Sequence, residues 1–143
     1  MKEIAVFVDG SKHSRRALQM AKDVAEKFGS KLYIINVQQT VFPHMTYKPY
    51  NILPGNYEKI LKENGEAILN KAKTYLEDSN IEISTILLKG EDIAETIINY
   101  LDKRNLDLVV MGSRGLSGAT RFLLGSVSLR VMTYAKIPVL IVK

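Results

Sequence analysis

The stretch LDLVVMGSRGLSGATRFLLGS, residues 106–126, decides how this chain folds. Residues 106–111 form a nearly uninterrupted apolar run, which is typical of a strand covered by helices on both faces. Glycines and small polar residues follow this run, and a helical pattern begins near Val127. The stretch therefore predicts one buried strand, a glycine-rich loop and the start of a helix.

Four more apolar runs rich in β-branched residues lie outside this stretch, at residues 4–8, 32–37, 81–88 and 138–142. Together with residues 106–111 they predict five strands. Three of the runs are almost wholly apolar, whereas residues 81–88 alternate more between apolar and polar side chains. That alternation predicts a strand nearer an edge of the sheet.

Amphipathic stripes at helical spacing separate these runs. Their apolar members are Ala17, Ala21, Val24, Ala25 and Phe28; Leu61, Ile68, Leu69, Ala72 and Leu76; Ile93, Ile97, Ile98 and Leu101; and Val127, Val131, Met132 and Ala135. Gly29 follows the first stripe, where a helix C-cap is expected. Strands that alternate with helices imply right-handed crossovers. The predicted fold is a doubly wound, open, parallel five-stranded α/β sheet with helices on both faces.

Composition limits the class of protein. A chain of 143 residues with 46% hydrophobic content has the size of one domain, which we expect to span residues 1–143. The chain contains no cysteine, so disulfides and thiolate metal sites are excluded and a reducing, cytoplasmic location is expected. The first apolar run ends at Asp9, far short of a signal-peptide core or a membrane span. No association with a membrane is expected.

The formal net charge of +5 favours anionic partners in general. The lysines and arginines are scattered through the helical patterns and mixed with glutamate, which is more typical of solvated helix faces than of a nucleic-acid surface. Nucleic acid is therefore not an expected partner.

Residues 38–56 hold too many prolines and aromatic residues for a helix and predict a long loop. A lid or a partner surface is the alternative interpretation of that loop.

The placement of the glycine-rich loop points to an anion. In doubly wound sheets, ligands bind outside the carboxyl ends of the strands, near the point where the strand order reverses. Gly112 and Gly115 allow backbone amides to approach phosphate oxygens closely. Gly125 and Ser126 would add amides and a hydroxyl at a helix N-terminus, with Ser128 in the same turn. On the residues alone, these glycines could equally only shape a turn, and Ser126 could only cap a helix.

A resemblance to a known family begins at this loop. Gly112, Gly115, Gly125 and Ser126 reproduce the spacing G-x2-G-x9-G-[S/T] without a gap. In this pattern the chain resembles the ATP-binding branch of the universal stress protein family. The segments VDGS (8–11), VMGSRGLSG (110–118), LLGSVS (123–128) and IPVLIV (137–142) are also similar to the family, so the resemblance reaches both ends of the chain.

The resemblance implies ATP as the ligand, with Mg²⁺ or Mn²⁺ held through its phosphates, on an adenine nucleotide alpha hydrolase-like, Rossmann-like sheet. Asp9 would accept hydrogen bonds from ATP or order the cation, although it could instead cap the next helix. Val37 would pack on adenine, and Arg114 could reach the phosphates, unless it is merely solvated. The remaining expected nucleotide-binding residues are Met111, Gly112 and Gly115 around the ribose and phosphates, and Gly125, Ser126, Val127 and Ser128 at the second phosphate element.

The expected function is that of a nucleotide-dependent regulatory or stress-response module. The resemblance also implies a homodimer paired through the C-terminal strand Val139–Val142, whose edge would otherwise be exposed. His13 and His44 are the only histidines, and no catalytic triad, metal-ligand spacing or Walker motif can be assembled from the sequence. Dedicated catalysis is not expected. A slow ATP-hydrolysing enzyme and a dimeric adaptor that binds no nucleotide stay open as alternatives.

Overall fold

The protein, described by a computed structural model over residues 1–40, 56–114 and 124–143, is built on one parallel five-stranded sheet. Its strands are β1 (Glu3–Phe7), β2 (Lys31–Gln39), β3 (Ile83–Gly90), β4 (Leu108–Gly112) and β5 (Val139–Val142). The strand order is β3-β2-β1-β4-β5, and every pairing is parallel. All five predicted strands are confirmed, and β3 lies at an edge as its alternating pattern predicted.

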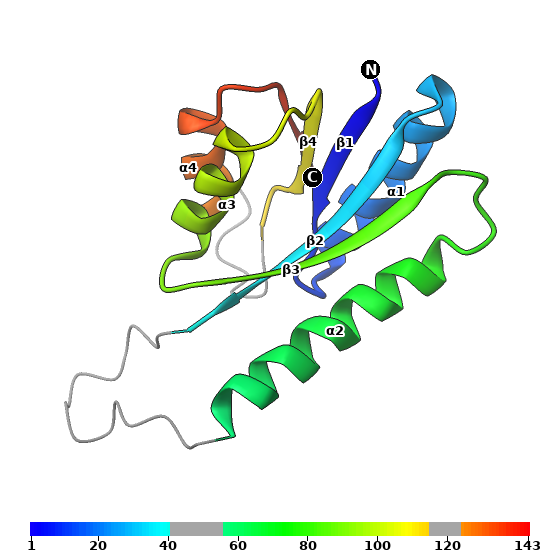
Figure 1. Ribbon diagram of the computed structural model, residues 1–143. Helices are drawn as coiled ribbons and strands as arrows, with labels where there is room; N and C mark the ends of the chain where they lie inside the picture. The colour runs from blue at the N-terminus through cyan, green and yellow to red at the C-terminus, as the bar shows by residue number, and fades with distance from the viewer. Residues whose placement is uncertain (41–55, 115–123) are drawn as a thin grey trace.

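Within residues 1–40, 56–114 and 124–143, four helices cover the sheet in two pairs (Figure 1). They are α1 (Lys12–Phe28), α2 (Tyr57–Tyr75), α3 (Ile93–Asp102) and α4 (Ser126–Tyr134). The buried residues of α1 and α2 share one core cluster with β1 side chains such as Ile4 and Val6. Those of α3 and α4 share a second cluster with Ala5 and Phe7. Successive β1 side chains point to opposite faces, so the two clusters confirm that helices cover both faces.

The ends of α1 follow from its local sequence. Ser11 is the N-cap, and its hydroxyl accepts a 3.1 Å hydrogen bond from the Ser14 amide. Gly29 ends the helix in the left-handed conformation, with φ of 62°, as its position in the sequence predicted. Helix α1 therefore starts directly after the end of β1, and its first turn lies beside the carboxyl ends of the strands.

The strand order reverses between β1 and β4, because β1 pairs with β2 on one side and with β4 on the other. A buried amide holds the chain where β1 ends. Asn36 is 2% exposed, its Nδ2 donates to the Val8 carbonyl at 2.8 Å, and its Oδ1 accepts from Gln38 at 2.7 Å. Both polar atoms of the Asn36 side chain are therefore hydrogen-bonded, and the bond to Val8 fixes the end of β1 against β2.

Within the described residues, no helix is long and apolar enough to cross a bilayer.

Candidate functional site

A pocket of about 140 Å³ lies at the carboxyl ends of β1, β2 and β4, where the strand order reverses. Helices α3 and α4 supply its other walls. The expected site residues that line it are Asp9, Val37, Met111, Gly112, Arg114, Gly125, Ser126, Val127 and Ser128. Gly115, the remaining expected site residue, lies outside the described residues, as does His44. The structure therefore brings together residues that are more than a hundred positions apart in the chain.

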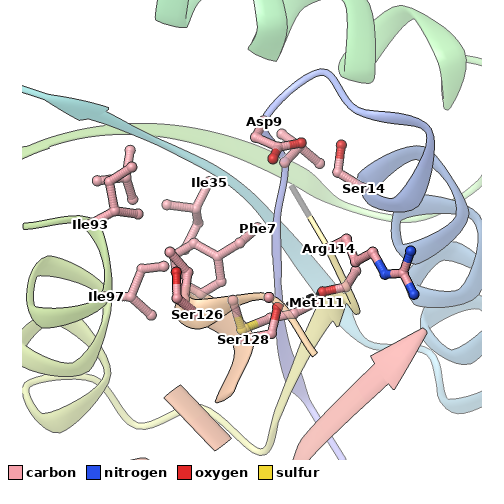
Figure 2. A pocket seen from close by; sticks show the side chains of 15 residues that line it. Phe7, Asp9, Ser14, Ile35, Ile93, Ile97, Met111, Arg114, Ser126 and Ser128 are labelled. Carbon is pink, nitrogen blue, oxygen red and sulfur yellow. Dashed lines mark hydrogen bonds between the residues drawn. The ribbon is translucent and has the colours of Figure 1, made fainter. Parts of the chain in front are cut away.

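The pocket has an apolar side and a polar side (Figure 2). Phe7, Ile35, Ile93 and Ile97 are grouped on one side, and the carboxylate of Asp9 lies with the Ser14 side chain on the other. The guanidinium of Arg114 points away from the isoleucines. An apolar wall facing a few fixed polar groups is the usual composition of a small-molecule site.

Six lining residues were not among the expected site residues: Phe7, Val8, Ser14, Ile35, Ile93 and Ile97. The isoleucines of α3 were expected to face the sheet, and they do so at the very edge where the pocket opens. The sequence could have predicted that Ile93 and Ile97 line the pocket, because residues at i and i+4 near a helix N-terminus cover the carboxyl edge of a parallel sheet. Phe7 and Ile35 carry no such signal, since buried strand residues look alike in sequence.

The first turn of α4 offers unpaired amides to the pocket. The Leu129 amide makes the first intrahelical bond, to the Gly125 carbonyl at 2.9 Å. The amides of Ser126, Val127 and Ser128 have no acceptor within the described part of the chain, and no side chain caps this end. Three free N–H groups at the positive end of the helix dipole favour an anion.

The expectation that Gly125 also presents its amide is wrong. The Gly125 amide donates to the Ser113 carbonyl at 2.7 Å, which closes the loop that follows β4. Gly125 instead serves as the N-cap position of α4, with φ of −59° and ψ of 151°. Ser126 therefore becomes the first residue whose amide is available to a ligand.

Ser128 ties α4 to β4. Its hydroxyl donates to the Gly112 carbonyl at 2.7 Å, and the side chain is 4% exposed. Gly112 is in turn packed against the start of α1, since a Cβ built on it would lie 2.8 Å from the His13 carbonyl carbon. The small size of Gly112 is therefore explained by its contact with α1, and the approach to phosphate oxygens stays a prediction.

Asp9 shapes the turn between β1 and α1. One of its carboxylate oxygens accepts the Ser11 amide at 2.9 Å, while Ser11 itself caps the helix. The alternative role of Asp9 as the helix cap is therefore taken by Ser11. The second carboxylate oxygen of Asp9 has no partner among the described residues, and it is available on the polar side of the pocket.

The main chain of β2 is open at Val37. The Leu32 amide bonds the Glu82 carbonyl next to β3, whereas the Lys31 amide and the Ile35 carbonyl bond residues in or next to β1. Odd-numbered residues of β2 therefore turn their main-chain groups toward β1. Because β1 ends at Phe7, the N–H and C=O of Val37 find no partner in the described ranges. They add a donor and an acceptor beside the apolar wall.

An ion pair joins α3 to α4 near the pocket. Nη1 of Arg130 lies 2.9 and 2.8 Å from the two carboxylate oxygens of Asp92, the N-cap residue of α3. The backbone N–H of Glu95, followed by the Arg130 guanidinium, lowers the pKa of Asp92 below its usual value. The pair fixes the spacing between the two helices that form the pocket wall.

Replacing Arg130 by glutamine should lower the free energy of unfolding slightly at neutral pH. A carboxylate with a lowered pKa stabilises the fold above its unfolded pKa and loses this effect as the pH falls through the folded-state pKa. The difference between parent and Arg130→Gln should therefore shrink on acidification. Urea unfolding at several pH values measures it, with the exposed Arg16→Gln as the control. A difference that stays constant with pH would contradict the role given to this pair.

The pocket volume limits what the described walls enclose. Sites that surround a drug-sized ligand measure about 300–1,000 Å³, so a pocket of about 140 Å³ holds only part of a nucleotide-sized molecule. A larger ligand would extend beyond these walls.

Comparison with known proteins gives consistent matches over the full length. The family model described as the universal stress protein family matches residues 1–143. The universal stress protein MJ0531 of Methanocaldococcus jannaschii is 37% identical over 147 residues, which cover 99% of this chain and 82% of that protein.

Two solved structures have the same fold. The hypothetical protein MJ0577 matches with a TM-score of 0.82 and 25% identity, over 99% of this chain and 95% of that one. A universal stress protein solved in complex with cAMP matches with a TM-score of 0.72 and 26% identity, over 99% and 97%.

Proposed function

Since the chain belongs to the universal stress protein family, we propose that it is a regulatory module that binds ATP in the pocket at the ends of β1, β2 and β4. One observation carries the proposal. The three unpaired amides at the start of α4 line the same pocket as an apolar wall and the open main chain of Val37. An anion site beside a slot for a flat ring matches the chemistry of an adenine nucleotide.

Each part of the nucleotide has a counterpart in this proposal. Adenine packs against Val37 and the isoleucines, and the N–H and C=O of Val37 pair with its polar edge. The ribose lies near Met111, and the phosphates accept hydrogen bonds from the amides of Ser126 and Val127. The structural relative solved with cAMP supports an adenine nucleotide as the ligand class.

A divalent cation would bind mainly through the phosphates. No group of three or more acidic or histidine side chains that could hold a metal exists among the described residues. Asp9, with one carboxylate oxygen free, is the protein group suited to contact a Mg²⁺ or Mn²⁺ ion on ATP. The cation would neutralise charge between Asp9 and the phosphates, so it should strengthen binding of ATP more than of AMP.

The proposal includes a homodimer through β5. Strand β5 pairs only with β4 in the described sheet, and all four of its residues are partly exposed. A second copy would satisfy the open edge of Val139–Val142. Sedimentation of the purified protein tests this part separately from nucleotide binding.

Calorimetry with ATP, ADP and AMP tests the proposed function. We expect one site per chain, with ATP binding more tightly in the presence of Mg²⁺, because each added phosphate can accept from the α4 amides. A phosphate-release assay run in parallel distinguishes a binding module from a slow hydrolase. A folded protein that binds none of the three nucleotides would leave the dimeric adaptor as the better description.

A further inference from the structure

A second cavity is lined by residues of α1 and α2. These two helices lie on the face of the sheet that α3 and α4 do not cover (Figure 1). The cavity volume of about 540 Å³ falls within the range of small-molecule sites. The proposed nucleotide function makes no use of it. Its lining residues are Val8, Gly10, Ser11, Ser14, Arg15, Leu18, Ala67, Ile68, Lys71, Ala72, Thr74 and Tyr75. We call it the α1–α2 groove.

Two contacts fix how the helices are aligned along this groove. A Cβ built on Gly10 would lie 3.8 Å from Cγ1 of Ile68. The Tyr75 hydroxyl donates to Oε1 of Gln19 at 2.9 Å, about two turns farther along both helices. Between these contacts, Arg15 of α1 and Lys71 of α2 come to the same level on opposite sides of the groove.

Arg15 and Lys71 carry unbalanced charge. Elsewhere on these helices, lysines pair with a glutamate one turn later, as in Lys22–Glu26, Lys59–Glu63 and Lys62–Glu66. Arg15 and Lys71 have no acidic residue three or four positions away in either direction. Neither makes an ion pair within the described residues, and no carboxylate lines the groove. Two exposed cations that line the same cavity, one from each helix, favour an anion there.

Much of the rest of the wall is apolar. Val8, Leu18, Ile68 and Ala72 are apolar, and among the described residues Tyr75 is the one aromatic residue that lines the groove. Such a wall offers an alkyl chain a continuous contact but gives a nucleobase little to stack on. The hydroxyls of Ser11 and Ser14 already donate to or accept from the backbone of the α1 N-terminus, so they add little further polarity.

We propose that the α1–α2 groove binds an anionic alkyl chain, a medium-chain fatty carboxylate, whose head group lies between Arg15 and Lys71. The carboxylate accepts hydrogen bonds from the guanidinium and the ammonium. The chain lies along the partly exposed Ile68 and the exposed Ala67 and removes apolar surface there from water. The groove shares Val8 and Ser14 with the pocket at the strand ends, so the two sites have one wall in common.

Calorimetric titration of the purified protein with decanoate, below its micelle concentration, tests the proposal. We expect one molecule bound per chain. Octanoate should bind about fifteenfold more weakly, because each buried methylene is worth about 0.8 kcal/mol, about fourfold in Kd. Decanol, which has the same chain without the charge, should bind at least about tenfold more weakly than decanoate, as expected for loss of a charged hydrogen-bond partner.

Variants separate the head-group contact from the chain contact. The double variant Arg15→Gln/Lys71→Gln should weaken decanoate binding about tenfold or more. Its matched control is Arg16→Gln/Lys73→Gln, which removes the same charge from exposed positions on the same helices outside the groove. Ala67→Phe, an exposed position on the groove wall, keeps both cations but fills the space for the chain, so it should abolish binding.

Three results would overturn the proposal. The first is no binding of decanoate by the folded parent protein. The second is equal affinity for decanoate and decanol, since this would assign no role to the cations. The third is an equal loss in the two double variants, because binding would then follow net charge and not the groove.

Discussion

Replacing Gly112 by alanine should lower the free energy of unfolding by about 3 kcal/mol, the upper end of the usual cost of overpacking a core. The added Cβ would lie 2.8 Å from the carbonyl carbon and 2.9 Å from the carbonyl oxygen of His13. Both are backbone atoms of α1, so no side-chain rotation can relieve the contact. Either β4 or α1 must shift, and the Ser128 hydrogen bond to the Gly112 carbonyl shifts with it.

Urea unfolding of Gly112→Ala and of the parent protein measures this cost. Gly29→Asn is the matched control, because nothing lies within 4 Å of its added Cβ and asparagine tolerates the left-handed conformation. The control should lose less than about 1 kcal/mol. If Gly112→Ala were as stable as the control, the close packing of α1 on β4 would not exist in solution.

Replacing Ser126 by proline should weaken ATP binding about ten- to a hundredfold while the protein stays folded. Proline removes the N–H of the first residue of α4, which is proposed to donate to the phosphates, and proline is well tolerated at the first position of a helix. The preceding residue must be extended, and Gly125, with ψ of 151°, already is. The substitution therefore deletes one donor with little change in backbone geometry.

Calorimetry of Ser126→Pro is compared with that of Ser126→Ala. Alanine removes the hydroxyl but keeps the amide, so it should retain most of the affinity. Thermal unfolding without nucleotide should be similar for both variants. Equal affinity in the proline variant and the parent would mean that the start of α4 is not the phosphate site.

Periodicity was sufficient to predict the sheet, because strands buried on both faces differ from amphipathic helices over many residues. The apolar run at residues 4–8 overlaps β1, which begins and ends one residue earlier. The alternation at 81–88 placed β3 at an edge. The predicted start of β3 was early. Ile81 packs on the core as an apolar residue should, but pairing with β2 joins Leu32 to Ile83. An apolar side chain indicates that a residue is buried, but it does not indicate whether the backbone of that residue pairs with a neighbouring strand.

The candidate site was predicted in part. A glycine pattern indicates that the backbone makes a close contact, but it does not show whether the contact is with a ligand or with another part of the chain. Gly112 packs closely on α1, and the Gly125 amide donates to the Ser113 carbonyl. The proposed phosphate contacts are therefore assigned to Ser126 and the residues after it. The Asp92–Arg130 pair could not be predicted, since the two residues are 38 positions apart and meet only through the packing of α3 on α4.

The attachment of α4 has a kinetic consequence. The helix start is held by Gly125 on Ser113 and by Ser128 on Gly112, and its next turn is held by Arg130 on Asp92. The donors and acceptors of these bonds all belong to the chain itself, so the amides proposed to bind phosphate are preorganised, and little conformational entropy is lost there when an anion binds. Encounter rates should then be similar for ATP, ADP and AMP, and selectivity among them should be expressed as different residence times.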